Sequence, residues 1–315
     1  MKTILITDTH YGTRQNSINW LNSQCKFIYE QLIPYIKECN EEVKLIHLGD
    51  VFDSRSTIST MVADKVIHMF KDLSEIVKDF IIIAGNHDYY SPNSDSLNTI
   101  DLLFDHLNIK LVTKSVVIDN KNIYIPWYKW IEEPQMIQDL INTHGIENAF
   151  THADIVNEPV NIYCRHIYSG HIHIPYCKGN IRNLGSTYPL NFADANTPHG
   201  FYVIHDDGKL EFVENVKSIR FHRLYNEDIF TMDNMNELDY IELYINQTNL
   251  SNQRYINQIN FISKKWKNVW IIPQVELIES EIQDVQFSEY DIESITKEMI
   301  PNHLLDKFNI ILKNL

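Results

Sequence analysis

The sequence has few cysteines, few glycines, little positive charge and no long apolar run, and these shortages exclude several classes of protein. Four cysteines in 315 residues, none of them in a C-x-x-C pair, argue against a disulfide-stapled domain and against a cysteine-rich zinc site. Basic residues number 27 and acidic residues 42, so the net charge is −15, which excludes a protein that coats nucleic acid with a basic surface. No apolar run is long enough to span a bilayer, so we expect no membrane contact and reduced thiols in a cytoplasmic protein.

The remaining composition is that of an ordinary globular protein. Hydrophobic residues make up 44% of the chain and charged residues 22%. A chain of this length can bury a sizeable core as one large domain or two smaller ones.

Short apolar strands alternate with helical stretches over the first two thirds of the chain, which predicts βαβ units and an α/β fold. We predict strands at 3–7, 44–48, 80–84, 116–118, 122–125, 149–151, 165–169 and 200–204. We predict helices at 20–39, 57–73, 94–106 and 133–143.

The pattern changes after about residue 218. A strand at 239–246, a helix at 251–266 with Ser251 as N-cap and a strand at 269–277 predict a small second domain. Two short helices, at 288–299 and 302–312, are expected to follow. The predicted domains are therefore 1–218, 219–287 and a helical segment at 288–315.

Polar side chains gather where the predicted strands end, and glycine lies in or beside several of these places. An α/β sheet carries its functional site at such ends. The clusters are Asp8-Thr9-His10, Gly49-Asp50-Val51-Phe52-Asp53, Gly85-Asn86-His87-Asp88, Thr151-His152 and Gly170-His171-Ile172-His173.

Carboxylate, amide and imidazole groups together suit a pair of borderline divalent ions. Two such ions lie about 3.5–4 Å apart in enzymes of phosphoryl chemistry, and one carboxylate must then bridge them. Asp50 is the natural bridge, because its strand lies between those that deliver the other side chains.

The ordered set D-x-H, G-D-x-x-D, G-N-H-D, a lone H and G-H-x-H resembles the calcineurin-like metallophosphoesterase superfamily. The segments Ile125-Pro126-Trp127, 184–190 and His199-Gly200-Phe201 narrow the resemblance to nuclease subunits of SbcD-type double-strand-break repair complexes, most closely to the recombination endonuclease small subunits of T-even-like phages. The resemblance implies a four-layer α/β/β/α sandwich with a small C-terminal α+β capping domain.

The resemblance also implies the cofactors and their ligands. One ion would be held by Asp8, His10, Asp50 and His173, and the other by Asp50, Asn86, His152 and His171. The ions would be Mn²⁺, with Mg²⁺ as the weaker substitute. His87 would be the acid that protonates the leaving oxygen or a cation that stabilises the transition state, and Asp53 would orient it. Archaeal and eukaryotic members carry His where this chain has Asp53, whereas bacterial and phage members carry Asp.

The implied activity is metal-dependent 3′→5′ exonuclease and endonuclease action on DNA, in end processing, recombination and repair. The implied partners are DNA and an SMC-like coiled-coil ATPase of SbcC type, with a homodimer of this chain inside a heterotetramer. The location would be the cytoplasm of a bacterium or of a phage-infected host. The apolar periodicity of 288–315 fits docking on the ATPase and packing on the small domain equally well.

Two other functions stay open on the same fold. One is a small-substrate phosphodiesterase or a protein phosphatase, although the chain departs from the phosphatase motifs G-D-x-V-D-R-G and G-N-H-E at both positions. The other is a non-catalytic scaffold, although no ligand position is missing.

Several single residues also allow two interpretations. Arg14 and Arg55 follow metal motifs and are weak candidates for contacts with substrate phosphate. The aromatic group Trp127, Tyr128 and Trp130 fits base stacking or a packed loop. Asp88 is interpreted as a structural cap and His47 as a buried histidine whose hydrogen bonds are satisfied.

Overall fold

The computed structural model describes residues 1–91, 94–154, 162–231 and 235–274. The chain divides into two compact units, Met1–Pro273 and Gln274–Leu315, and the described residues belong almost entirely to the first. The predicted helices at 288–299 and 302–312 lie outside the described residues, and the domain boundaries at 218 and 287 stay predictions.

The first sheet carries the N-terminal strand at its centre. Four neighbouring strands, β1, β2, β3 and β6, run parallel, and β13 and β14 extend the sheet antiparallel. In sheet order the strands are β14 (Leu210–Glu214), β13 (Gly200–Ile204), β1 (Lys2–Ile6), β2 (Val43–His47), β3 (Asp79–Ile83) and β6 (Lys110–Val112).

The second sheet also has four parallel strands, but here one antiparallel strand lies at each edge. In sheet order the strands are β11 (Tyr176–Lys178), β12 (Ile181–Asn183), β10 (His166–Ser169), β9 (Asn148–Thr151), β8 (Asn122–Ile125) and β7 (Val117–Asp119).

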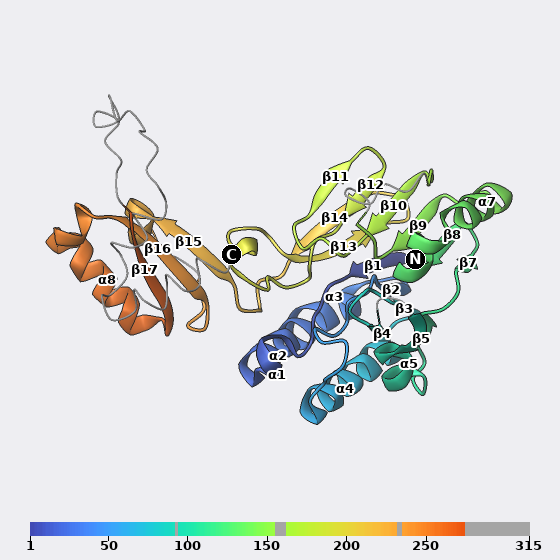
Figure 1. Cartoon of the computed structure of the whole chain (residues 1–315), viewed down its shortest axis with the longest axis horizontal. Helices are drawn as coiled ribbons and strands as arrows, with labels where there is room; N and C mark the ends of the chain where they lie inside the picture. The colour runs from blue at the N-terminus through green and yellow to red at the C-terminus, as the bar shows by residue number, and fades with distance from the viewer. Residues whose placement is uncertain (92–93, 155–161, 232–234, 275–315) are drawn as a thin grey trace, which may run out of the picture. The chain divides into compact units, whose positions relative to one another are not determined.

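Three buried clusters show that the two sheets and their helices form four layers (Figure 1). The first cluster joins one face of the first sheet to α2 (Ile18–Phe27), α3 (Ile33–Glu38), α4 (Thr60–Ile76) and α5 (Thr99–Phe104). The second packs the two sheets on each other, with Leu5 and Ile46 facing the stacked rings of Tyr124 and Phe150. The third joins the outer face of the second sheet to α6 (Trp127–Glu132) and α7 (Pro134–His144). The predicted α/β/β/α sandwich is confirmed.

Local sequence explains the covering helices. In α4, Val62, Val66 and Phe70 recur at helical spacing and are fully buried, and the Ser59 side chain caps the helix by accepting a hydrogen bond from the Val62 N–H. The helix predicted at 20–39 runs from α2 through a π-helical turn, Ile28–Leu32, into α3.

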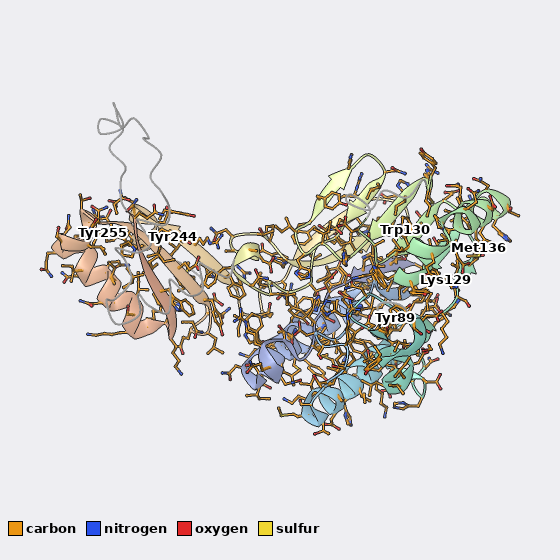
Figure 2. The ribbon with its side chains drawn as sticks, viewed as in Figure 1. Tyr89, Lys129, Trp130, Met136, Tyr244 and Tyr255 are labelled. Carbon is orange, nitrogen blue, oxygen red and sulfur yellow. The ribbon has the colours of Figure 1, made fainter. Side chains whose placement is uncertain are left out.

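A third sheet of β15 (Phe221–Tyr225), β16 (Tyr240–Asn246) and β17 (Asn268–Gln274) follows, with α8 (Gln253–Lys265) packed on it. Tyr255 of α8 lies in the buried cluster between helix and sheet, whereas Tyr244 of β16 stacks on Tyr225 (Figure 2). Short 3₁₀ turns at Asn226–Phe230 and Asn249–Ser251 connect these elements, and a third, Phe192–Asp194, lies between β12 and β13.

Two local predictions are wrong. The stretch predicted as a helix at 94–106 starts with β5 (Ser94–Asn98), paired with β4 (Tyr89–Ser91), because Asn98 caps α5 and delays its start. Asn252, not Ser251, caps α8, since its side chain accepts from the Arg254 N–H. All four cysteines are unpaired, as predicted, and none of the described helices could cross a membrane.

Candidate metal centre

The candidate metal centre lies where strands of both sheets end on the same side. Parallel strands bring their carboxyl ends to a common edge, and here two sheets contribute to it. Asp8 and His10 follow β1, Asp50 follows β2, Asn86 and His87 follow β3, His152 follows β9, and His171 and His173 follow β10.

The backbone at this edge is strained. Asp8, His10, Asp50 and His171 have φ angles of 50°, 44°, 53° and 78°, in the left-handed region that non-glycine residues avoid. Each such residue costs about 1–3 kcal/mol and persists only where its surroundings enforce it, which is common at functional sites. At Gly85, an added Cβ would collide with the Asp50 side chain, so only glycine permits this approach.

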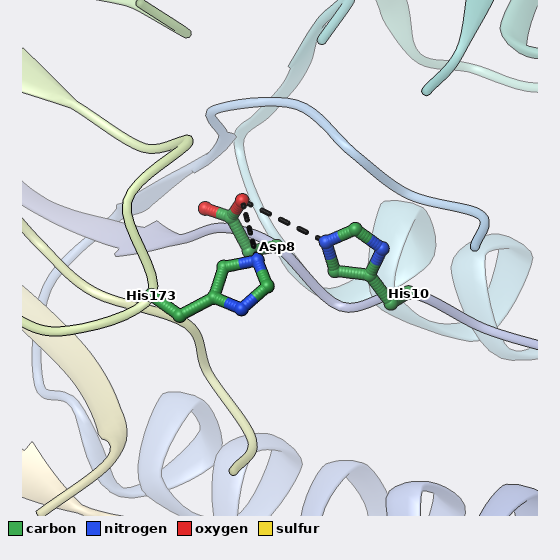
Figure 3. Close-up of side chains that lie close together, drawn as sticks. All are labelled: Asp8, His10 and His173. Carbon is green, nitrogen blue, oxygen red and sulfur yellow. Dashed lines mark ion pairs between the residues drawn. The ribbon is translucent and has the colours of Figure 1, made fainter. Parts of the chain in front are cut away.

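Three side chains form one group of possible ligands: Asp8, His10 and His173. Asp8 Oδ1 lies 3.8 Å from His10 Nε2 and 3.9 Å from His173 Nε2 (Figure 3). The Asp8 carboxylate is itself fixed, because it accepts hydrogen bonds from Thr7 Oγ1 at 2.6 Å and from the His171 N–H. One carboxylate oxygen therefore faces two imidazole nitrogens.

Asp50, His152 and His171 form another group, and Asn86 joins them. His152 Nε2 lies 3.2 Å from Asp50 Oδ2 and 3.1 Å from the Asn86 amide oxygen, which is 2.8 Å from His171 Nδ1. His152 Nδ1 lies 2.9 Å from the Leu48 carbonyl oxygen and must carry a proton to donate to it. That bond orients the ring so that Nε2 faces the group.

Asp50 lies between the two groups. Its Oδ2 atom is 3.7 Å from His10 Nε2 and 3.2 Å from His152 Nε2, while Oδ1 accepts a hydrogen bond from the His87 N–H at 2.8 Å. One oxygen of Asp50 thus faces ligand-type atoms from both sides, as a bridging carboxylate must.

Acidic and imidazole groups shift each other's pKa values in the metal-free protein. Burial opposes protonation of His10, but Asp53, Asp8 and Asp50 outweigh it and raise its pKa to about 10. Burial acts in the same way on His152, and the charges of Asp50 and Asp8 raise its pKa to about 9. Although burial raises the pKa of Asp8 and of Asp50, the neighbouring histidines, His152 first, lower both pKa values on balance.

The residues present fit a pair of divalent ions. His10 is 97% buried from solvent, and its ring nitrogens make no hydrogen bond of good geometry among the described residues but face carboxylate oxygens of Asp8, Asp50 and Asp53 at 3.4–3.8 Å. The Asn86 side-chain amide faces His152 Nε2 and His171 Nδ1: turned one way it presents its oxygen as a ligand, and turned the other way it donates to both rings and accepts from Arg55. Carboxylate, amide and imidazole ligands together match Mn²⁺, Fe²⁺ or Zn²⁺ better than an all-oxygen Ca²⁺ or Mg²⁺ site.

Asp53 meets His87 through its main chain and not through its carboxylate, so the predicted carboxylate–imidazole pair stays a prediction. Asp53 offers its main-chain carbonyl to His87 Nδ1, at 2.6 Å, and turns its carboxylate to His10, whose Nδ1 lies 3.4 Å from Oδ1. The carboxylates around the buried His10 favour a proton on its ring, and a protonated ring favours the contact with the Asp53 carboxylate. A carboxylate that contacts a metal-binding imidazole in this way is common at metal sites. His87 also lies within 4.8 Å of ligand-type atoms of His10 and Asp50, so its ring borders the centre.

The two arginines differ in place. Arg55 Nη2 lies 3.3 Å from the Asn86 amide atom that points away from the histidines, so Arg55 borders the centre. Arg14 contacts the rings of Trp20, Phe221 and Tyr240 at 4.9–5.2 Å and donates to the Leu190 carbonyl. The structure does not bring Arg14 into the centre and does not support it as a phosphate contact.

Asp88 and His47 have the structural roles predicted for them. The buried Asp88 carboxylate accepts hydrogen bonds from the Gly85, Asp50 and Val51 N–H groups. Burial, followed by the charge of Asp50, raises its pKa to about 7. Burial also lowers the pKa of His47 to about 3, so this ring is neutral.

Two threonines escaped the analysis of the sequence. Thr7 Oγ1 donates to Asp8, and Thr9 Oγ1 contacts His47 Nε2 at 2.9 Å. The available signal was the hydroxyl residue on each side of Asp8 in Ile6-Thr7-Asp8-Thr9-His10.

The aromatic segment after β8 packs into the protein. Trp130 is 1% exposed and lies in the core between the second sheet and its helices (Figure 2). Trp127 and Tyr128 are partly buried against Tyr89. The packed-loop interpretation is therefore confirmed for Trp130 and favoured for its neighbours, although a helix, α6, forms in place of a loop.

Comparisons with known proteins give one family and two similar proteins. Residues 1–175 match the calcineurin-like phosphoesterase family. The chain is 23% identical over 318 positions to exonuclease subunit 1 of Enterobacteria phage T4, covering 94% of this chain and 90% of that protein. It also resembles the crystal structure of the nuclease MPE of Pseudomonas putida, with 20% sequence identity and a TM-score of 0.30. That match covers 57% of this chain and 66% of the nuclease chain, just under two thirds of its length.

The family match spans more than half of the chain and includes the ordered motifs at 8–10, 49–53, 85–88, 152 and 170–173. The chain belongs to the calcineurin-like phosphoesterase family and is a hydrolase of phosphoester bonds.

Proposed function

We propose that the protein is a DNA nuclease that hydrolyses phosphodiester bonds with two divalent ions, Mn²⁺ in preference to Mg²⁺. The family supports phosphoester hydrolysis, and the exonuclease subunit of phage T4 supports DNA as the substrate. The mixed nitrogen and oxygen ligands support Mn²⁺, since Mg²⁺ prefers oxygen ligands in a strict octahedron.

Two half-sites would share Asp50. The first half-site consists of Asp8, His10, His173 and Asp50, and the second of Asn86, His152, His171 and Asp50. Ions bound there would activate water as a nucleophile and offset the charge that develops on the phosphate. Thr7, the Leu48 carbonyl and the Asp53 carboxylate would keep the ligands of the two half-sites aligned.

His87 would act as the acid that protonates the departing ribose oxygen. Its Nδ1 is committed to the Asp53 carbonyl, which leaves Nε2 to deliver a proton. The ring is half-buried, whereas His10 and His152 are buried, so a substrate can reach it. Arg55 would hold a non-bridging phosphate oxygen beside Asn86.

One observation carries the proposal: Oδ2 of Asp50 lies within 3.7 Å of His10 Nε2 and 3.2 Å of His152 Nε2. A carboxylate oxygen between two sets of ligand-type atoms is the arrangement that two-metal phosphoryl chemistry needs. A centre with a single ion would leave one of these two sets of ligand-type atoms without a metal to bind.

The test is an end-labelled linear duplex incubated with the protein and Mn²⁺, with p-nitrophenyl phosphate esters in parallel. Release of labelled nucleotides supports the proposal. Ester turnover without DNA cleavage would replace it with the small-substrate or protein phosphatase alternative, and inactivity on both with bound metal would favour the scaffold.

Two histidine variants sharpen that assay. His87→Ala should keep both ions but lower DNA cleavage by about 10²–10⁴-fold, the usual contribution of a general acid. His68→Ala is the matched control, since His68 is an exposed histidine of α4 that pairs with Asp64 within its own helix. Cleavage by His87→Ala at the control's rate would remove His87 from the acid role.

The proposed biological setting is a complex in the cytoplasm of a bacterium or phage-infected cell. A chain of net charge −15 repels DNA beyond the reach of its bound ions, so a partner that grips DNA would supply the missing attraction. The partner would be an SMC-like ATPase, with two copies of this chain in a heterotetramer that processes DNA ends in recombination and repair. The proposed docking segment, 288–315, lies outside the described residues.

A further inference from the structure

The turn of Gly49, Asp50 and Val51, here called the Asp50 turn, carries the carboxylate shared by the two half-sites. Asp50 occupies the left-handed region at φ 53°, and Gly49 has φ 110°. A relaxed backbone would leave this region and rotate the Asp50 side chain away from one of its neighbours. The surroundings must therefore hold the turn, and side chains outside the ligand set do so from two sides.

Asp88 holds the turn from one side. The Asp88 carboxylate is fully buried, and its Oδ2 accepts from the Asp50 N–H at 2.9 Å and from the Gly85 N–H at 2.8 Å. Its Oδ1 accepts from the Val51 N–H at 3.0 Å. One carboxylate thus ties the Asp50 turn to the turn after β3, from which Asn86 and His87 arise.

His47 and Thr9 hold the turn from the other side. The Gly49 N–H donates to His47 Nδ1 at 3.1 Å, so the proton of the neutral ring lies on Nε2, which donates to Thr9 Oγ1 at 2.9 Å. Thr9 Oγ1 in turn donates to the Val51 carbonyl at 3.1 Å. This chain of hydrogen bonds links both ends of the Asp50 turn to the segment between Asp8 and His10.

We propose that Asp88, with His47 and Thr9 opposite it, is a positioning residue that fixes the Asp50 turn and thereby the spacing of the two metal ions. This inference rests on the proposed two-metal site. Asp88 touches neither substrate nor ion and acts through the backbone of Asp50. An amide at position 88 would present an N–H₂ group to at least one of the three N–H donors, so the turn would lose a bond and gain a repulsion.

The experiment compares Asp88→Asn with a matched control, Asp239→Asn. Asp239 is also fully buried and accepts two backbone N–H bonds, from Arg220 and Asn236, beside a contact with His222, but it lies just before β16 of the third sheet. The full-length proteins are titrated with Mn²⁺ alone by calorimetry, and the exchange coupling of the Mn²⁺ pair is measured by electron paramagnetic resonance. Melting temperatures report the general loss of stability.

We expect Asp88→Asn to bind at least one Mn²⁺ about 10–100-fold more weakly and to show an altered coupled spectrum. Asp239→Asn should melt earlier but keep wild-type Mn²⁺ affinity and coupling. Wild-type binding and coupling in a folded Asp88→Asn protein would overturn the inference, as would equal losses in both variants.

A second variant covers the case in which Asp88→Asn does not fold. Thr9→Val keeps the shape of the side chain and removes only the hydroxyl that joins His47 to Val51. An altered coupled spectrum in Thr9→Val supports the inference, and an unchanged one overturns it. Failure of the wild-type protein to bind two Mn²⁺ ions would instead overturn the proposed function, and this inference with it.

Discussion

The two proposed half-sites share Asp50 but differ in the distances between their facing ligand-type atoms. In the second half-site, the atoms facing one another are 2.8–3.2 Å apart, and His152 is fully buried with its ring fixed by the Leu48 carbonyl. In the first, the facing atoms are 3.7–3.9 Å apart, and the His173 side chain is 28% exposed.

The difference indicates unequal preparation for an ion. A group that is already assembled loses little conformational entropy when it binds, whereas the partly exposed His173 would lose more. We therefore expect the second half-site to bind Mn²⁺ more tightly than the first. His173 is also more exposed to solvent than His152, which suits exchange of an ion at that ligand.

Removing the shared ligand should have the largest effect, because it affects both half-sites. Asp50→Asn keeps the shape of the side chain but takes away the charge that faces His10 and His152. We expect DNA cleavage to fall about 10³-fold or more, since several kcal/mol of charge stabilisation are lost. Calorimetry should find fewer than two Mn²⁺ ions per chain, and two ions at wild-type affinity would exclude Asp50 as the bridge.

Removing one histidine ligand from each half-site in turn should separate the two Mn²⁺ binding steps. His152→Ala is expected to remove the tighter Mn²⁺ binding step, because it deletes the fixed imidazole of the second half-site. His173→Ala should weaken only the looser step, by about 10–100-fold. The titration of both variants with Mn²⁺ measures this, and the reverse order of losses would contradict the assigned difference between half-sites.

Protons should compete with ions at both half-sites. The pKa of His10 is raised to about 10 and that of His152 to about 9, so both rings carry protons at pH 7 in the metal-free protein. An ion must displace them, so Mn²⁺ affinity should rise by about tenfold per pH unit for each displaced proton. Calorimetry in buffers of different ionisation enthalpy counts the protons released.

The same pKa values set the stability of the metal-free protein. Because the pKa values of His10 and His152 are higher in the folded than in the unfolded protein, protonation of these rings stabilises the folded state. This stabilisation is fully present below pH 6.5 and is lost as the pH rises through about 9–10. Thermal melting should therefore show the metal-free protein weakening from pH 7 to 10 while saturating Mn²⁺ removes most of that loss. Parallel curves would show that the two histidines do not hold protons in this range.

The smallest expected effects separate the two arginines. Arg55→Ala should raise the KM for DNA about tenfold and leave Mn²⁺ binding unchanged, because Arg55 lies beside the far end of the Asn86 amide and not among the carboxylate and imidazole groups. Arg14→Ala should leave KM unchanged and lower the free energy of unfolding by about 0.5–2 kcal/mol, as its ring contacts are lost. A rise in KM for Arg14→Ala would restore its predicted phosphate contact.

The sequence predicted the layered fold and the side chains that meet at the strand ends. Strands such as Lys2–Ile6 and Val43–His47 are mostly apolar because they are covered on both faces, and the clusters of ligand-type residues follow directly where these strands end. Spacing along the chain therefore translated directly into position. The short edge strands, such as Leu210–Glu214 and Tyr176–Lys178, are half-exposed and lack that pattern.

The choice of partner within a cluster was not accessible from the sequence. Asp53 lies three residues after Asp50, and nothing in that spacing tells whether its carboxylate or its carbonyl meets His87. The backbone φ of Arg14, 52°, likewise directs a long side chain to distant aromatic rings of the third sheet. Such contacts depend on local dihedral angles and on residues hundreds of positions away.

Anomalous diffraction from a crystal soaked in Mn²⁺ tests the central claim most directly. Two peaks are expected, one on each side of the Asp50 carboxylate, with the stronger peak among Asn86, His152 and His171. A single peak, or peaks away from Asp50, would contradict a two-metal centre bridged by this residue.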